Sequence, residues 1–232
     1  MLANILSLAA LALGVSAATI PVTPRDTASV GVTPHDHYSS SVGVLGCHIN
    51  TNRVAYWPMA VDCNNICVQV SYGGRTLNLL RIDQSGGAYD ISYDAWNYLY
   101  TGQGATVAPV AGGAVSMDYQ NVPASNCAGL INSANGGLPL SAANSMNFLT
   151  SCAAGTWVGD HHVLYNILNP VCTYGYDEVC TLAAGANQAT CPHTLGSNNP
   201  LTTAPVYNIL YPSGQVALAT QVRHPVERKK FW

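Results

Sequence analysis

Charged side chains are scarce in this sequence: Asp, Glu, Lys and Arg make up 8% of its 232 residues, whereas an average domain has roughly 25%. The net charge is −3. Nucleic-acid binding needs a basic patch, and the only basic run is RHPVERKKFW at residues 223–232. We interpret this run as a solvated tail, with a trimming site for a basic-specific protease as the alternative. No nucleic-acid partner is expected.

The sequence also lacks the common catalytic and metal-binding motifs. It has no GxSxG elbow, no HExxH helix and no P-loop. Cys63 and Cys67 have the spacing of a ligand pair, but no matching Cys/His pair follows at zinc-site distance. HDHY at residues 35–38 could bind a metal only weakly, and we interpret it instead as a disordered polar segment. We therefore predict no metal and no cofactor.

Long apolar runs are absent except at the N-terminus, MLANILSLAALALGVSAATIP. Its apolar core of about a dozen residues, followed by small residues, is typical of a signal peptide at residues 1–18. The run is too short to span a bilayer comfortably, so we predict a secreted protein, extracellular or in the cell wall, and no membrane partner. Residues 19–41 are rich in Thr, Pro, Ser and Val without periodicity, which predicts a flexible leader or propeptide.

Eight cysteines follow the signal peptide, and an even number in a secreted chain predicts disulfides with no free thiol. Eight cysteines allow 105 pairings. Four lie before residue 130 and four after residue 150, and we favour pairing within each half. They are Cys47, Cys63, Cys67, Cys127, Cys152, Cys172, Cys180 and Cys191.

From residue 42 the pattern predicts short strands, at 41–49, 54–57, 66–72, 76–83 and 113–122. Gly73-Gly74 predicts a hairpin turn between the third and fourth of these. Residues 92–102 predict one helix, capped by Ser92 and ended by Gly102. Short strands with one inserted helix favour a mainly β fold built on a small barrel.

Residues 131–222 predict a Cys-rich extension packed on the barrel. A helix is expected within LPLSAANSMNFLTSC, beginning at Leu140 or Ser141. His161 and His162 are adjacent, so in a strand they would face opposite ways, and a capping turn or polar edge is the interpretation we adopt. The echo of VLYNILNP in VYNILYPSG predicts paired strands or a weak internal repeat.

The segment CTYGYDEVC, from Cys172 to Cys180, predicts a disulfide-anchored loop rich in tyrosine. Tyr174 and Tyr176 are candidates for stacking on sugar faces, because aromatic rings present an apolar surface. Packing of the two rings beneath a disulfide is the alternative interpretation.

Residues 43–130 resemble a double-psi β-barrel, the fold of barwin, cerato-platanins, expansins, kiwellins and the catalytic domain of some endoglucanases. In particular, YDIS followed by DAW resembles the FDLS element of expansins. The resemblance implies a closed six-stranded barrel over residues 42–130 in a fungal-type secreted protein. The residues that carry it are Gly46-Cys47, Tyr56-Trp57, Cys63, Cys67, the strand ending at Asp83, Tyr89–Ser92 and VSMDYQNVPASNC.

The same resemblance implies that Asp90 lies in a groove, because the acid of the FDLS element does so in expansins. In the endoglucanases the matching acid is the proton donor, and Asp83 is the candidate second carboxylate. Tyr56, Trp57 and Tyr89 are the other candidate ligand-binding residues. The alternative is structural: Asp83 would hold the Gly86-Gly87 turn, and Asp90 would bond backbone near the helix start.

The sequence thus predicts a monomeric, non-hydrolytic protein that binds cell-wall polysaccharide or an extracellular protein. One alternative is a protease inhibitor or a host-directed effector. The other is a glycoside hydrolase that uses Asp90 and Asp83.

Overall fold

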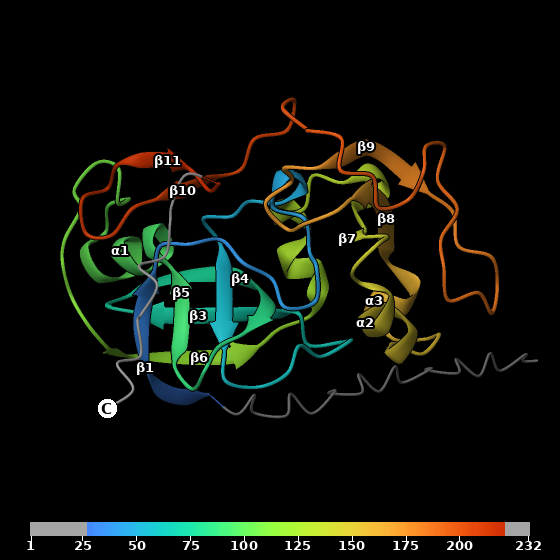
Figure 1. The fold of residues 1–232 in the computed structure, drawn as a ribbon. Helices are drawn as coiled ribbons and strands as arrows, with labels where there is room; N and C mark the ends of the chain where they lie inside the picture. Colours follow the sequence, from blue (N-terminus) through green and yellow to red (C-terminus); the bar gives the residue numbers. More distant parts are fainter. Residues whose placement is uncertain (1–26, 221–232) are drawn as a thin grey trace, which may run out of the picture.

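The computed structural model describes residues 27–220, so the predicted signal peptide at 1–18 and the basic tail at 223–232 lie outside the described residues. Within this range no helix is both long and apolar enough to cross a membrane. The chain forms a barrel, seen on the left of Figure 1, and an extension that packs against it.

Six strands close the barrel in the order β1-β5-β2-β4-β3-β6, which confirms the predicted six-stranded architecture. Two neighbouring pairs, β1 with β5 and β2 with β4, are parallel, and the others are antiparallel. The strands are β1 (Ala28–His35), β2 (Val54–Trp57), β3 (Cys67–Tyr72), β4 (Arg75–Gln84), β5 (Tyr89–Ser92) and β6 (Val115–Asn121).

The first barrel strand corrects two predictions. Residues 28–35 lie in the predicted leader, yet they form β1, which pairs with β5 on one side and β6 on the other. Residues 41–49 were expected to be a strand, but they form only the short 3-10 helix η1 (Gly46–His48) and isolated bridges. The barrel therefore begins at Ala28, since β1 occupies the position that residues 41–49 were predicted to fill.

The Gly73-Gly74 turn joins β3 and β4 as predicted. Both glycines have positive φ, 56° and 76°, which is the requirement of a type I′ hairpin turn. The helix α1 (Tyr93–Thr101) is also confirmed, and Gly102 ends it with a left-handed φ of 87°. Ser92 holds the N-cap position without capping: its hydroxyl donates to the Thr51 carbonyl and accepts from the Val54 N–H.

The extension shares a hydrophobic core with the outer face of the barrel. Val54, Tyr56, Leu80 and Ile82 from β2 and β4 pack in one buried cluster with residues of the extension such as Leu164. A second cluster fills the barrel interior and the contact with α1. All four residues of β2 are buried, because successive side chains of a strand face opposite sides and both sides of this strand are covered.

The extension contains two small sheets and two short helices. β7, β8 and β9 form a three-stranded sheet, and β10 and β11 form a hairpin that lies beside α1 at the top left of Figure 1. The 3-10 helix η2 (Ala124–Leu130) leads from the barrel into the extension. The elements of the extension are η3 (Ala134–Gly136), β7 (Leu138–Ser141), α2 (Met146–Ser151), α3 (Trp157–Asp160), β8 (His162–Ile167), β9 (Gly175–Cys180), β10 (Tyr207–Ile209) and β11 (Val216–Leu218).

The structure contradicts one prediction for the extension and excludes one of the two interpretations of the YNIL segments. The helix expected from Leu140 or Ser141 begins only at Met146, because residues 138–141 are buried as β7 and pair with β8. The two YNIL segments do not pair with each other: β8 pairs with β7 and β9, whereas β10 pairs with β11.

All eight cysteines form disulfides, as predicted, but not within each half. Cys67–Cys127 and Cys180–Cys191 are local to one half. Two others cross from the barrel to the extension, and they are Cys47–Cys172 and Cys63–Cys152. The pairing preference was wrong because the extension folds back over the first half of the chain.

We predict that the crossing disulfide Cys63–Cys152 stabilises the fold more than the short-range disulfide Cys180–Cys191 does. Cys63–Cys152 closes a separation of 89 residues and Cys180–Cys191 one of 11. Because the entropy removed from the unfolded chain grows with loop length, replacing both cysteines by Ser should cost about 4.5 kcal/mol for the first pair and about 3 kcal/mol for the second. Urea unfolding of the two double variants under non-reducing conditions measures the difference, and an equal or reversed order would contradict it.

Candidate functional site

Four polar residues lie in one row across neighbouring strands of the barrel. In the strand register Thr33 of β1 is opposite Asp90 of β5, Asp90 is opposite Tyr56 of β2, and Tyr56 is opposite Asp83 of β4. Residues opposite each other on adjacent strands project from the same face of a sheet. We call Thr33, Asp90, Tyr56 and Asp83 the polar row.

A β-bulge brings Asp83 into the row. Ala55 is opposite Arg81, but the next residue of β2, Tyr56, is opposite Asp83, so Ile82 is an extra residue in β4. A bulge re-aims the side chain that follows it. Asp83 therefore shares the face of Tyr56, and the two acids of the row lie on either side of this tyrosine.

Asp83 is occupied by three hydrogen bonds. It accepts from the Ser39 hydroxyl at 2.5 Å, from the Ser41 N–H at 2.7 Å and from the N–H of Gln84 at 2.8 Å, and it is only 7% exposed. The carboxylate thus anchors residues 39–41 and not the Gly86-Gly87 turn, which corrects the structural role that the sequence indicated.

Asp90 is the more accessible acid of the row. It lies in β5, is partly exposed, and accepts a hydrogen bond from the Thr33 hydroxyl through Oδ1. It makes no bond to backbone at the start of α1, which corrects that alternative. Its Oδ2 accepts no hydrogen bond from the residues at 27–220, so one carboxylate oxygen of Asp90 has no partner among them.

His35 and Tyr56 extend this polar surface. The two rings lie 4.5 Å apart between centroids. Burial lowers the pKa of His35, and the negative charge of Asp90 opposes that shift. Burial and then the charge of Asp83 raise the pKa of Tyr56 far above its usual value, so this phenol stays protonated.

Part of this surface is covered by the extension. A cavity of about 10 Å³, the space of roughly one water molecule, lies between His35, Tyr56 and Ser92 of the barrel and residues 207–209 of β10. Tyr56 is 3% exposed as a result. Tyr56 is therefore the buried member of the polar row and does not present its ring to solvent. This corrects its prediction as a ligand-binding side chain.

Trp57 and Tyr89 lie on the other side of the strands. Trp57 is fully buried in the barrel interior, and its ring makes edge contacts with Tyr89 at 5.3 Å and Tyr119 at 4.4 Å. Trp57 is therefore a core residue, contrary to its prediction as a ligand-binding residue. Tyr89 is partly exposed.

The predicted disorder of residues 35–38 is wrong. His35 ends β1, Asp36 accepts from the Tyr211 N–H at 2.9 Å, and the buried Tyr38 donates its hydroxyl to the Val44 carbonyl at 2.7 Å. Across residues 27–220 no group of three or more His, Cys, Asp or Glu is arranged to hold a metal ion.

His161 directly follows α3, and His162 is the first residue of β8. Their Nδ1 atoms lie 3.1 Å and 2.9 Å from the carbonyl oxygens of Trp157 and Val158. The rings therefore close the last turn of a short helix, which confirms the capping interpretation.

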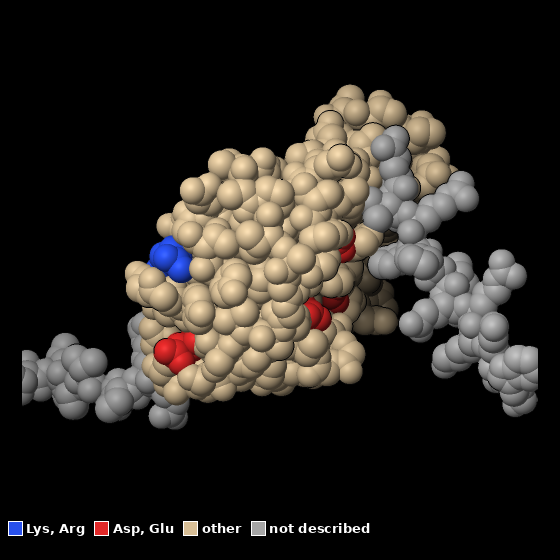
Figure 2. All heavy atoms as spheres, turned by 90° about the vertical axis from the view of Figure 1, so that its left-hand side faces the viewer, with Lys and Arg blue, Asp and Glu red and all other residues tan. Residues whose placement is uncertain are grey.

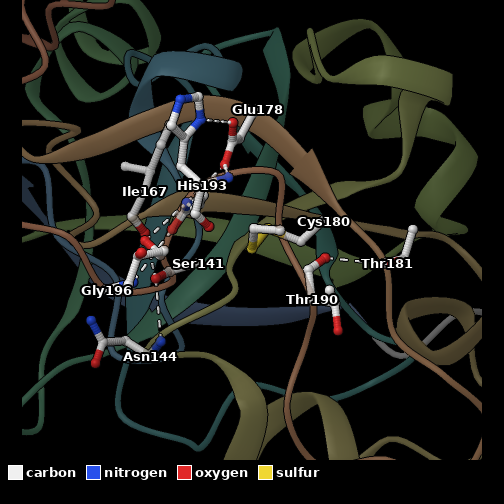
Figure 3. Close-up of a disulfide and its surroundings, with 12 residues drawn as sticks. Ser141, Asn144, Ile167, Glu178, Cys180, Thr181, Thr190, His193 and Gly196 are labelled. Carbon is white, nitrogen blue, oxygen red and sulfur yellow. Dashed lines mark hydrogen bonds and ion pairs between the residues drawn. A yellow bond between two sulfur atoms is a disulfide. The ribbon is translucent and has the colours of Figure 1, made fainter.

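The tyrosine-rich segment is not a loop closed by its own two cysteines, since Cys172 pairs with Cys47 and Cys180 with Cys191. Tyr176 stacks on His193 at 3.9 Å. Figure 3 shows Glu178 bonded to His193 beside Cys180, with Glu178 Oε2 at 2.6 Å from His193 Nδ1. Desolvation raises the pKa of Glu178, but hydrogen bonds from His193 and Asn166 lower it more. The contacts of Tyr176 and Glu178 thus support packing.

Comparison with known proteins agrees with the barrel. The cerato-platanin family model matches residues 35–130, from the last residue of β1 to the end of η2. These residues are therefore similar to cerato-platanins, and the closed six-stranded barrel fits a double-psi β-barrel. Residues 131–220, which form the extension, lie outside the match.

Among solved structures the chain is similar to cerato-platanin 3 from M. perniciosa, with 16% identity over 43% of this chain and 98% of that one, at a TM-score of 0.33. A search of the curated proteins finds no match.

The sequence missed the part of the candidate site that comes from β1 and from residues 39–41. Thr33 and His35 alternate in VTPH as residues of one strand face do, and this short signal was obscured by the surrounding Thr, Pro and Ser. Nothing local indicates the bonds from Ser39 and Ser41 to Asp83, because they join residues more than 40 positions apart.

We predict different roles for the two acids in stability. Asp83→Asn places an amide N–H₂ among three donors, and the unsatisfied groups should lower the free energy of unfolding by about 1–3 kcal/mol. Asp90→Asn should cost less than about 1 kcal/mol, because Asp90 is partly exposed and accepts one side-chain bond. Urea unfolding of both variants measures this, and an Asp83→Asn variant as stable as the wild type would contradict the anchoring role.

Proposed function

We propose that this protein is a secreted, non-hydrolytic binder of cell-wall polysaccharide and that Asp90 contacts the sugar. The observation that carries the proposal is the accessibility of Asp90 within the polar row: one oxygen is oriented by Thr33, and the other is available to accept from a sugar hydroxyl. The similarity of residues 35–130 to cerato-platanins supports a secreted binding role.

The character of the surface supports a neutral ligand. Four disulfides are typical of an oxidising, extracellular compartment. The face of the molecule in Figure 2 carries few charged side chains, separated by wide neutral areas. A strongly charged partner would lack complementary charge on such a surface, whereas a neutral polysaccharide would bind through hydroxyl groups and ring faces.

The arrangement of the two acids argues against hydrolysis. An inverting glycosidase needs two carboxyl groups that flank a water, and a retaining enzyme needs an accessible nucleophile. Here Tyr56 lies between Asp83 and Asp90 in the row, and the carboxylate of Asp83 is buried and already accepts three hydrogen bonds. Asp83 therefore lacks the freedom to serve as a base or nucleophile.

The test is retention of the full chain on insoluble chitin, cellulose and β-1,3-glucan, with reducing ends measured in the same tubes. We expect retention on at least one polysaccharide without release of reducing sugar. Asp90→Asn should weaken that retention at least about tenfold, the effect of losing a charged hydrogen bond, and should leave the melting temperature nearly unchanged.

The chain offers a matched control for Asp90. Asp118 of β6 accepts a hydrogen bond from Ser29 of β1, just as Asp90 of β5 accepts from Thr33, but it lies outside the polar row. Asp118→Asn should bind like the wild type. Equal loss in both variants, or no retention on any polysaccharide, would contradict the proposal, and the second result would favour a protein partner. Release of reducing sugar that depends on Asp90 would indicate a hydrolase.

A further inference from the structure

A groove runs along the junction between the barrel and the β10–β11 hairpin. Its volume is about 460 Å³, within the range of roughly 300–1,000 Å³ typical of ligand sites. One wall comes from the chain before β2 and from the start of α1, and the other from the hairpin. We call this space the junction groove. Its lining includes Thr51, Asn52, Asp94, Thr106, Tyr207 and Val216.

Specific hydrogen bonds fix the hairpin against the barrel. The Tyr38 N–H donates to Asn208 Oδ1 at 2.9 Å, and Asn208 is only 4% exposed. The N–H of Tyr211 donates to Asp36 at 2.9 Å, and its hydroxyl donates to the Gly112 carbonyl at 2.7 Å. Both walls of the junction groove are therefore held in place before any ligand arrives, which reduces the entropic cost of binding.

Two large apolar side chains in the groove are exposed and do not belong to the buried core. Tyr207 is 48% exposed and Val216 is 58% exposed, and no hydrogen bond is made by the Tyr207 side chain to the residues at 27–220. An aromatic ring at the edge of a groove offers a flat apolar surface to a ligand.

The polar residues that line the groove carry no uncompensated charge. The carboxylate of Asp94 accepts from Arg53 Nη1 at 2.8 Å and from the Ala105 N–H at 2.7 Å. The remaining polar residues, Thr51, Asn52 and Thr106, are neutral. A ring face beside neutral hydroxyl and amide groups suits a ligand with apolar C–H faces and many hydroxyl groups, and it offers nothing to balance an ionic ligand.

We propose that the junction groove is a second site, which binds a neutral oligosaccharide with one sugar ring on the face of Tyr207. This inference rests on the proposed polysaccharide binding, but it places the contact where one wall of the site comes from residues 205–216, outside the cerato-platanin match. The extension then has a direct part in binding besides covering the barrel.

The test is isothermal titration calorimetry of the full chain with laminarihexaose, cellohexaose and chitohexaose. At least one hexasaccharide should bind, and Tyr207→Ala should weaken that binding about tenfold, the cost of an aromatic contact. Tyr207→Phe should bind like the wild type, because it keeps the ring. Tyr174→Ala is the matched control, since Tyr174 is 43% exposed on the extension but does not line the groove.

A second variant guards against a fold defect at Tyr207. Val216→Ser, on the partner strand of the hairpin, should also weaken binding, and both variants should keep the wild-type melting temperature. Loss of binding in Tyr207→Ala and Val216→Ser together, with Tyr174→Ala unaffected, supports the groove.

Three results would overturn the inference, and they can be told apart. If the chain is retained on insoluble polysaccharide in an Asp90-dependent way while Tyr207→Ala binds all three hexasaccharides like the wild type, the junction groove is wrong and the proposed function stands. If no hexasaccharide binds and no polysaccharide retains the chain, both the groove and the proposed function are wrong. A Tyr174→Ala variant as weak as Tyr207→Ala would also overturn the groove.

Discussion

Strand β2 is buried on both of its faces, by the barrel interior on one side and by the extension on the other. Ala55 and Trp57 fill the barrel interior, whereas Val54 and Tyr56 pack in the core shared with the extension. An apolar strand of this kind cannot present either face to water without losing about 25 cal/mol for each Å² of apolar surface that is uncovered. The extension is therefore part of the same folded unit as the barrel, and two disulfides hold it there.

The burial of β2 also gives Asp83 and Asp90 different roles. Because Tyr56 must be buried, its neighbours in the polar row lie at the edge of a covered surface. On one side Asp83 compensates for burial by accepting bonds from residues 39–41 and from Gln84. On the other side Asp90 stays partly exposed. The same row thus supplies an anchor for the fold and a candidate contact for a ligand.

The sequence predicted the elements whose signals are local. Alternation identified β3 and β6, short aromatic or apolar runs identified β2 and β4, the Gly73-Gly74 dipeptide identified a hairpin, and the Ser92–Gly102 segment identified α1. β1 was missed because Thr, Pro and Ser dilute its alternation, and because its partners β5 and β6 are more than 50 residues away. Its role as a strand depends on those partners more than on its own propensity.

The features that define the candidate site were the least predictable. Cysteine spacing does not reveal that Cys47 and Cys63 pair with the extension, since pairing follows the fold of the whole chain. No residue in LLRIDQ predicts the bulge at Ile82, yet the bulge determines which face of β4 Asp83 occupies. Asp90 was identified only through the resemblance of YDIS to a known element, and its bond to Thr33 required the structure.

Barrel and extension thus form one cooperative unit around β2. Native-state hydrogen exchange of the full chain can establish this, with amides of β2 and of β8 measured separately. Both strands should exchange with the same free energy of opening, within about 1 kcal/mol, because neither can open without uncovering the shared core. Exchange from β8 at a much lower free energy than from β2 would show instead that the extension opens alone.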